Sequence, residues 1–179
     1  MIRVAPVAAS NADSKVTATL AQLKASLGMV PNLFATMANS PAAFDGYLGL
    51  KKTLSRGRLT DRQREIISLA VAQVNECQYC LSAHTHLSKA AGVSDADALK
   101  ARRGDGSDPL ERALGAFAKE IAQRRGHLSD QALEDARRAG IDDGLVMEIV
   151  ANVALNTLTN YVNEVAKTEI DFPVVEVKL

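Results

Sequence analysis

The chain has 179 residues, enough for one hydrophobic core, and we treat it as a single domain. Apolar residues make up 47% and charged residues 23%, a composition that excludes a disordered chain and is ordinary for a globular one. Basic and acidic residues both number 21, so the charge balance excludes the strongly basic surface that nucleic acid would require.

Helix start and stop signals recur from the beginning of the chain. Residues 10–13 resemble a capping box, and the helix that follows carries apolar residues at helical spacing until Gly28 ends it. Pro31 opens a short helix over residues 31–37. Ser40 with Pro41 then starts a third helix, which we expect to end near residues 56–57.

The next two helices are predicted to form the centre of the fold. Thr60 and Gln63 cap a helix that is apolar around most of its circumference, which predicts burial on all sides. Asn75 and Glu76 then interrupt the chain. With Asn75 as N-cap, a new helix carries both cysteines and runs to Gly92.

Four more helices are predicted to complete the chain. One begins at Ser94, another at Asp108 after the loop at residues 103–107, and two more at Ser129 and Asp142. In the last helix we expect these residues to face inward: Val146, Ile149, Val150, Val153, Ala154, Thr157 and Tyr161. No strand alternation occurs, so we predict an all-α, single-domain helical bundle over residues 1–179, with an extended C-terminal tail after about Thr168.

The two cysteines, Cys77 and Cys80, lie in one pair. The chain shows no export signal at its start and no apolar run long enough for a bilayer, so we expect a cytoplasmic protein without a membrane partner. Cytosolic thiol pools keep cysteines reduced, and the pair is therefore expected to serve catalysis or metal binding.

Helix geometry gives the two thiols different tasks. Residues three apart have Cα atoms about 5 Å apart, which permits a disulfide between Cys77 and Cys80. His84 lies one turn beyond Cys80 and leans toward it, but is about 10 Å from Cys77. We therefore expect His84 to activate Cys80 for attack on a peroxide, and Cys77 to resolve the resulting sulfenic acid. The helix end favours Cys77 as nucleophile instead, but it offers no proton acceptor.

Glu65 is the fourth candidate. In one continuous helix it would lie about 18 Å from Cys77, so it joins the site only if the chain turns back at residues 75–76. The alternative is a surface ion pair with Arg62 or Arg64.

These residues lead to a known family. Glu65, the Cys77-x-x-Cys80-x-x-x-His84 motif and residues 90–93 resemble the AhpD-like alkylhydroperoxidases of the carboxymuconolactone decarboxylase superfamily, with a motif core over residues 59–93. Residues 29–34 and 156–161 are similar to its peroxidase-related branch.

The resemblance implies a cofactor-free thiol peroxidase that reduces alkyl hydroperoxides or hydrogen peroxide. It implies that Cys80 is the peroxidatic thiol, that Cys77 resolves it, and that Glu65 and His84 relay protons through the first cysteine and a water. It further implies a dithiol reductant such as a lipoyl group and a homo-oligomer, trimeric or hexameric. Tyr79 stands where AhpD has a histidine, which leaves the substrate and the reductant open.

Several alternatives remain open. The cysteine pair suits a thiol-disulfide oxidoreductase or redox sensor, and the superfamily name suggests a non-redox decarboxylase. Cys77, Cys80 and His84 could also bind zinc, with His86 as a fourth ligand, or the cysteines could simply pack in the core. We interpret Asn156, Asn160 and Asn163 as a polar stripe that hydrogen-bonds within a helix interface.

Overall fold

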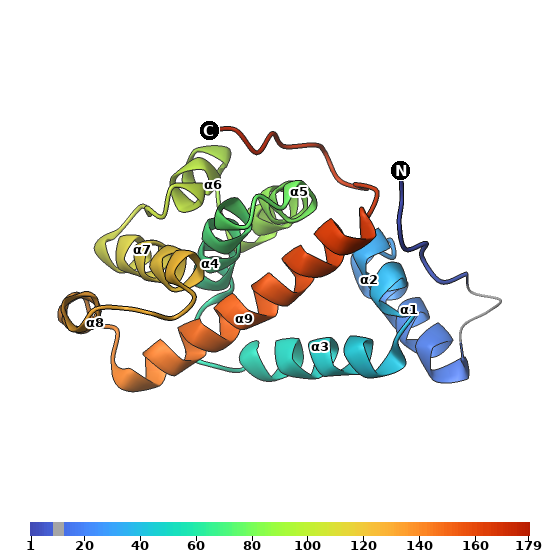
Figure 1. The fold of residues 1–179 in the computed structure, drawn as a ribbon, viewed down its shortest axis with the longest axis horizontal. Helices are drawn as coiled ribbons and strands as arrows, with labels where there is room; N and C mark the ends of the chain where they lie inside the picture. The colour runs from blue at the N-terminus through green and yellow to red at the C-terminus, as the bar shows by residue number, and fades with distance from the viewer. Residues whose placement is uncertain (9–12) are drawn as a thin grey trace.

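Nine α-helices and one short 3-10 helix follow one another in the described residues, 1–8 and 13–179, of the computed structural model (Figure 1). The helices are α1 (Ser14–Leu27), α2 (Asn32–Met37), α3 (Pro41–Leu54), α4 (Asp61–Val74), α5 (Gln78–Leu87), η1 (Ser88–Ala91), α6 (Asp95–Arg102), α7 (Pro109–Arg124), α8 (Asp130–Arg138) and α9 (Asp143–Ala166). These residues contain no strand, and the chain after α9 is extended. The predicted all-α fold and C-terminal tail are confirmed.

Side-chain caps explain where most helices begin. In each case a side-chain oxygen accepts a hydrogen bond from the backbone N–H three residues later. The caps are Asp13, Ser40, Thr60, Ser94, Asp108, Ser129 and Asp142. The capping box of Thr60 and Gln63 is complete. At α1 the cap is Asp13, and the remainder of the predicted box, residues 10–12, lies outside the described residues.

The chain reverses direction between α4 and α5. Glu76 has a positive φ of 52°, which no continuing α-helix can accommodate. The predicted break is therefore confirmed, but the predicted cap is wrong. Cys77 is the N-cap of α5, whereas the Asn75 side chain donates a hydrogen bond to Asn160 Oδ1 at 2.8 Å. Helix α5 also ends at Leu87, and η1 completes the path to Gly92.

Helix α4 forms the centre of the molecule, in contact with α5, α6, α7 and α9 (Figure 1). Residues 66–72 of α4 are all buried, as its apolar circumference predicts. Helix α9 runs diagonally across the fold beside it (Figure 1).

The buried face of α9 differs in part from the prediction. Val146, Ile149 and Val153 are buried as predicted, but Val150, Ala154 and Tyr161 are exposed and Thr157 is half-buried. The reason is that four asparagines take interior positions: Asn152, Asn156, Asn160 and Asn163. A buried amide is stable only with hydrogen-bond partners, and these side chains find most of theirs on α9 itself and around the cysteine pair.

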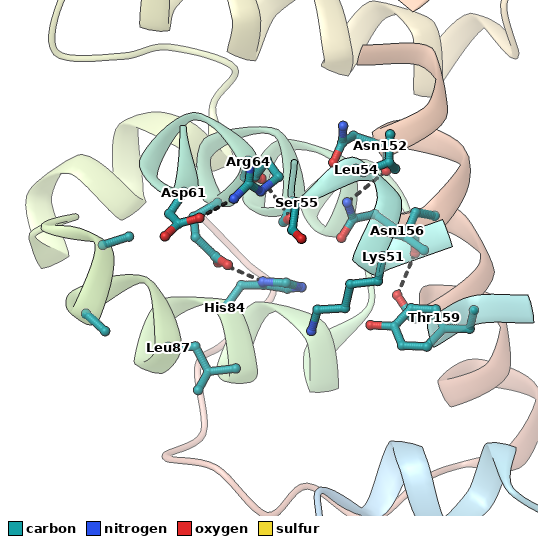
Figure 2. Close-up of a pocket in the computed structure, with 16 residues that line it drawn as sticks. Lys51, Leu54, Ser55, Asp61, Arg64, His84, Leu87, Asn152, Asn156 and Thr159 are labelled. Carbon is teal, nitrogen blue, oxygen red and sulfur yellow. Dashed lines mark hydrogen bonds and ion pairs between the residues drawn. The ribbon is translucent and has the colours of Figure 1, made fainter. Parts of the chain in front are cut away.

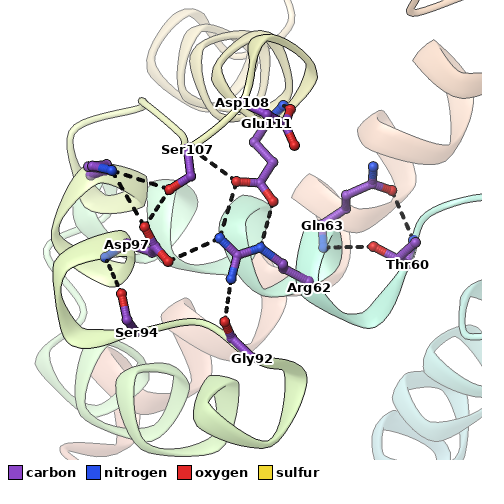
Figure 3. Close-up of polar contacts among 10 residues, drawn as sticks. Thr60, Arg62, Gln63, Gly92, Ser94, Asp97, Ser107, Asp108 and Glu111 are labelled. Carbon is purple, nitrogen blue, oxygen red and sulfur yellow. Dashed lines mark hydrogen bonds and ion pairs between the residues drawn. The ribbon is translucent and has the colours of Figure 1, made fainter.

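Arg62 anchors the N-terminal end of α4 to its neighbours (Figure 3). Its Nε donates to Glu111 Oε1 of α7 at 2.6 Å, and its Nη2 donates to Asp97 Oδ2 of α6 at 3.1 Å. A third hydrogen bond reaches the carbonyl of Gly92. The Glu111 side chain is only 7% exposed, so its carboxylate is shielded from solvent, whereas Arg62 is 25% exposed. The contact fixes the position of the helix that carries Glu65.

The C-terminal tail crosses the outer side of α5 and α6. The Tyr79 hydroxyl donates to Asp171 Oδ1 at 2.8 Å, and the Phe172 ring packs edge-on against the Tyr79 ring. Further along, Arg102 donates to the carbonyls of residues 176 and 177. The tail therefore covers the helix that holds the cysteines. Among the described helices, none is both long and apolar enough to span a membrane.

Candidate active site

The two cysteines lie at the start of α5, inside the protein. Cys77 is fully buried and Cys80 is 2% exposed, and both are free thiols. As N-cap, Cys77 accepts a hydrogen bond at its Sγ from the backbone N–H of Cys80, at 3.4 Å. The turn that starts the helix thus holds the two side chains together.

The surroundings separate the two thiols by acidity. A hydrogen bond from Cys77 lowers the pKa of Cys80 to about 6, against the effect of burial, and the charge of His84 lowers it further. The same hydrogen bond, together with burial, raises the pKa of Cys77 far above that of an ordinary thiol. The two pKa values are thus shifted in opposite directions, with Cys80 the more acidic thiol of the pair.

Two asparagines of α9 also contact Cys80. Asn163 Nδ2 donates to Cys80 Sγ at 3.3 Å. Asn160 is fully buried, and within the described residues its Nδ2 has no hydrogen-bond partner, but it lies near enough to lower the Cys80 pKa as well. The hydrogen bond of Asn163 joins α9 to α5, and Asn160 accepts one from Asn75, so the predicted polar stripe does hydrogen-bond at a helix interface. The signal in the sequence is the placement of three amides, four and three residues apart, on an otherwise apolar helix.

Glu65 and His84 form a pair beside Cys80. Their Oε2 and Nδ1 atoms are 2.8 Å apart, and each side chain is 22% exposed. Burial lowers the pKa of His84, but the charges of Glu65 and Cys80 outweigh it, so that the pKa is raised. The chain reversal at residue 76 makes this contact possible. The structure thus brings Glu65 next to His84, and His84 within electrostatic range of Cys80.

The alternative surface role of Glu65 does not fit these contacts. Arg62 pairs with Glu111 and Asp97, and Arg64 pairs with Asp61. Both basic neighbours on α4 are therefore engaged elsewhere, while the Glu65 carboxylate meets His84.

A cavity of about 330 Å³ opens at this pair (Figure 2). Leu54, Leu87 and Leu155 supply much of its apolar wall, and His84 and Glu65 line it together with Lys51. Neither cysteine lines it. A molecule in this cavity would therefore meet the imidazole and the carboxylate, whereas Cys80 lies in the interior at 2% exposure.

The cysteines and histidines do not form a metal-binding cluster. In the part of the chain that the structure describes, no group of three or more His, Cys, Asp and Glu residues is arranged to hold a metal ion. His86 packs against Phe172 of the tail, with ring centroids 6.0 Å apart, and faces away from the pair.

The profile of the carboxymuconolactone decarboxylase family matches residues 40–109. Over 93 residues the chain is 29% identical to the alkyl hydroperoxide reductase Rv2159c of Mycobacterium tuberculosis (strain ATCC 25618 / H37Rv). That match covers 51% of this chain but 27% of the relative, so the chain spans about a quarter of the relative's length. Together these matches confirm the resemblance to AhpD-like proteins of this superfamily.

Solved structures share the fold. An uncharacterized peroxidase-related protein with an AhpD core from Ralstonia eutropha JMP134 superposes with a TM-score of 0.86, at 22% identity, over 95% of this chain and 92% of that one. The debrominase Bmp8 superposes with a TM-score of 0.78, also at 22% identity, over 94% and 91%. At such identities the likeness shows the fold alone.

Proposed function

We propose that this chain, with its AhpD-like core, is a thiol-dependent peroxidase that reduces organic hydroperoxides or hydrogen peroxide. The observation that carries the proposal is the arrangement at the start of α5, where the Cys77 sulfur accepts the Cys80 N–H at 3.4 Å and Glu65 holds His84 at 2.8 Å. These surroundings lower the pKa of Cys80 and raise that of Cys77. A thiolate with a thiol in contact is the combination that a two-cysteine peroxidase needs.

In the first step, the Cys80 thiolate attacks the terminal oxygen of the hydroperoxide and the O–O bond breaks. The alkoxide that leaves takes a proton from His84, whose raised pKa keeps a proton available. The products are an alcohol and a sulfenic acid on Cys80. Glu65 holds the imidazole through its Nδ1 at 2.8 Å and stabilises its charged form.

In the second step, the Cys77 sulfur attacks the Cys80 sulfenic acid. A disulfide forms and water leaves with the thiol proton of Cys77. An external dithiol then reduces the disulfide and is itself oxidised to a disulfide, which restores both thiols. We include in the proposal a lipoyl-type dithiol as reductant and a cytoplasmic location, where such reductants are present.

A homo-oligomer is also part of this proposal. Large apolar side chains are exposed along α9, among them Met147 at 63%, Tyr161 at 59% and Val165 at 66%. Exposed apolar residues that recur on one helix are typical of an interface between protein chains. Size-exclusion chromatography with light scattering would detect a trimer or hexamer, and a monomer at micromolar concentration would contradict this part.

The test of the reaction combines peroxide consumption with mass spectrometry. One equivalent of cumene hydroperoxide should produce a Cys77–Cys80 disulfide in the natural protein, and a sulfenic acid on Cys80 in the Cys77→Ser variant. Cys80→Ser should abolish turnover, and His84→Ala should reduce it strongly. The matched control is His86→Ala, two residues along the same helix, which should remain active.

The same variants separate the thiol-disulfide oxidoreductase alternative from the peroxidase. Exchange with a small disulfide that runs much faster than peroxide reduction would favour that alternative. Full peroxidase activity in Cys80→Ser would refute the proposed mechanism.

A further inference from the structure

Among the described residues that line the cavity at His84, one basic side chain forms no ion pair. The basic lining residues are Lys51 and Arg64, and Arg64 is paired with Asp61. The Glu65 carboxylate is in contact with His84. Within residues 1–8 and 13–179, the Lys51 ammonium makes neither an ion pair nor a hydrogen bond.

The position of this ammonium is fixed by aromatic rings. Its Nζ lies 5.7 Å from the centroid of the Phe34 ring and 6.0 Å from that of the Tyr47 ring. Such contacts favour a cation over an aromatic face without neutralising it. Figure 2 shows the Lys51 side chain extending from α3 toward His84. The positive charge of Lys51 lowers the pKa of His84 and so acts against the effect of Glu65.

The surroundings of Lys51 favour a ligand. The residue as a whole is exposed, yet the protein around the amine desolvates it enough to lower its pKa, although Glu65 acts in the opposite direction. A partly desolvated cation gains more from an anionic partner than a fully hydrated one. The rest of the cavity wall is mixed, and Leu54, Leu87 and Leu155 provide apolar surface in it.

From this geometry we propose that Lys51 binds the carboxylate of an organic hydroperoxide whose apolar body lies in the cavity and whose peroxide group reaches His84. The inference rests on the proposed function for the nature of the reacting group. It names the substrate class as amphipathic hydroperoxy acids, in preference to neutral hydroperoxides. Lys51 is then the residue that determines specificity, separate from the groups that carry out the chemistry.

A binding experiment tests the proposed carboxylate site at Lys51 without any turnover. Titration calorimetry with octanoate and with octanol compares two ligands that differ in the charged end. The natural protein should bind octanoate about 10- to 100-fold more tightly than octanol, as expected for a charge-assisted contact. Lys51→Met should bring this ratio close to one, and Lys51→Arg should keep most of it.

The matched control is Lys52→Met, the same change at the next residue of α3, which does not line the cavity. It should keep the full octanoate preference. Equal binding of the two ligands by the natural protein would overturn the inference, as would an octanoate preference that survives Lys51→Met.

Turnover then tests the substrate class. The ratio of kcat/KM for a hydroperoxy fatty acid to that for cumene hydroperoxide should fall by about the same factor in Lys51→Met. A loss of equal size for both substrates would mean that Lys51 acts on the reacting centre, and would refute its role in specificity. Absence of peroxidase activity together with octanoate binding would refute the proposed function but leave the carboxylate site intact.

Discussion

The Asn163 amide is the contact on the Cys80 thiolate that a single substitution can remove most cleanly. Asn163→Leu deletes the Nδ2 donor that lies 3.3 Å from Cys80 Sγ. The same change also removes Asn163 Oδ1, a buried acceptor without a partner in the described residues, so the cost to folding is partly offset. The variant should therefore fold, with the thiolate as the group chiefly affected.

The size of the effect follows from the strength of the contact. A hydrogen bond to a charged group contributes about 1.5–3 kcal/mol, and sulfur belongs at the lower end because it is a weak acceptor. About 1.4 kcal/mol corresponds to one pKa unit. The pKa of Cys80 should thus rise from about 6 to roughly 7. At about pH 6 the thiolate fraction should fall from roughly one half to roughly one tenth.

The pH dependence of alkylation by iodoacetamide measures this pKa directly. The rate should rise with pH through the Cys80 pKa, since only the thiolate reacts, and Cys77 does not interfere because its own pKa is raised far higher. Asn156→Leu is the matched control, because its Nδ2 donates to the carbonyl of Asn152 in the same helix. An unchanged Cys80 pKa in Asn163→Leu would refute the assignment of this contact.

Three further outcomes are expected. Glu65→Gln should lower the pKa of His84, measured by NMR titration of the imidazole, and should slow peroxide reduction by about 10- to 100-fold. An unaltered His84 pKa would contradict the pairing of Glu65 with His84. Arg62→Met should leave Glu111 buried without its cationic partner and lower the free energy of unfolding, measured in urea, by about 3–5 kcal/mol. A decrease below roughly 1 kcal/mol would contradict the importance of this ion pair. Asp171→Asn should loosen the tail and speed hydrogen exchange at residues 170–177, with exchange in α7 unchanged; equal acceleration in both would indicate global destabilisation instead.

The sequence predicts the helices well because their caps are local. Ser94, Asp108, Ser129 and Asp142 each bond to an N–H three residues away, so a short window of sequence contains the whole interaction. Asn75 misleads the prediction because its side chain bonds to Asn160, 85 residues further along the chain. A local rule cannot detect such a competing partner.

In the candidate site, too, the sequence predicts the local features but not the contacts between distant segments. The distance between Cys77 and Cys80 follows from helix geometry, and the break that admits Glu65 could be anticipated from Asn75 and Glu76. The Asn163 contact with Cys80 depends on how α9 packs against α5, and the place of Lys51 at the cavity depends on how α3 packs against α9. Tertiary packing of this kind leaves little trace in one sequence.

In the proposed peroxidase cycle, the burial of the two cysteines limits the reductant more than the peroxide. Since Cys77 is fully buried and caps α5, a disulfide at this position offers no sulfur at the surface to a bulky protein. A hydroperoxide is small enough to diffuse in, but a reductant must either carry its thiols on a slender arm or wait for the first turn of the helix to open. The rate of oxidation then depends on the peroxide concentration, and the rate of reduction depends on the access of the dithiol to the disulfide. The disulfide form of the protein should therefore accumulate whenever a dithiol of suitable shape is scarce.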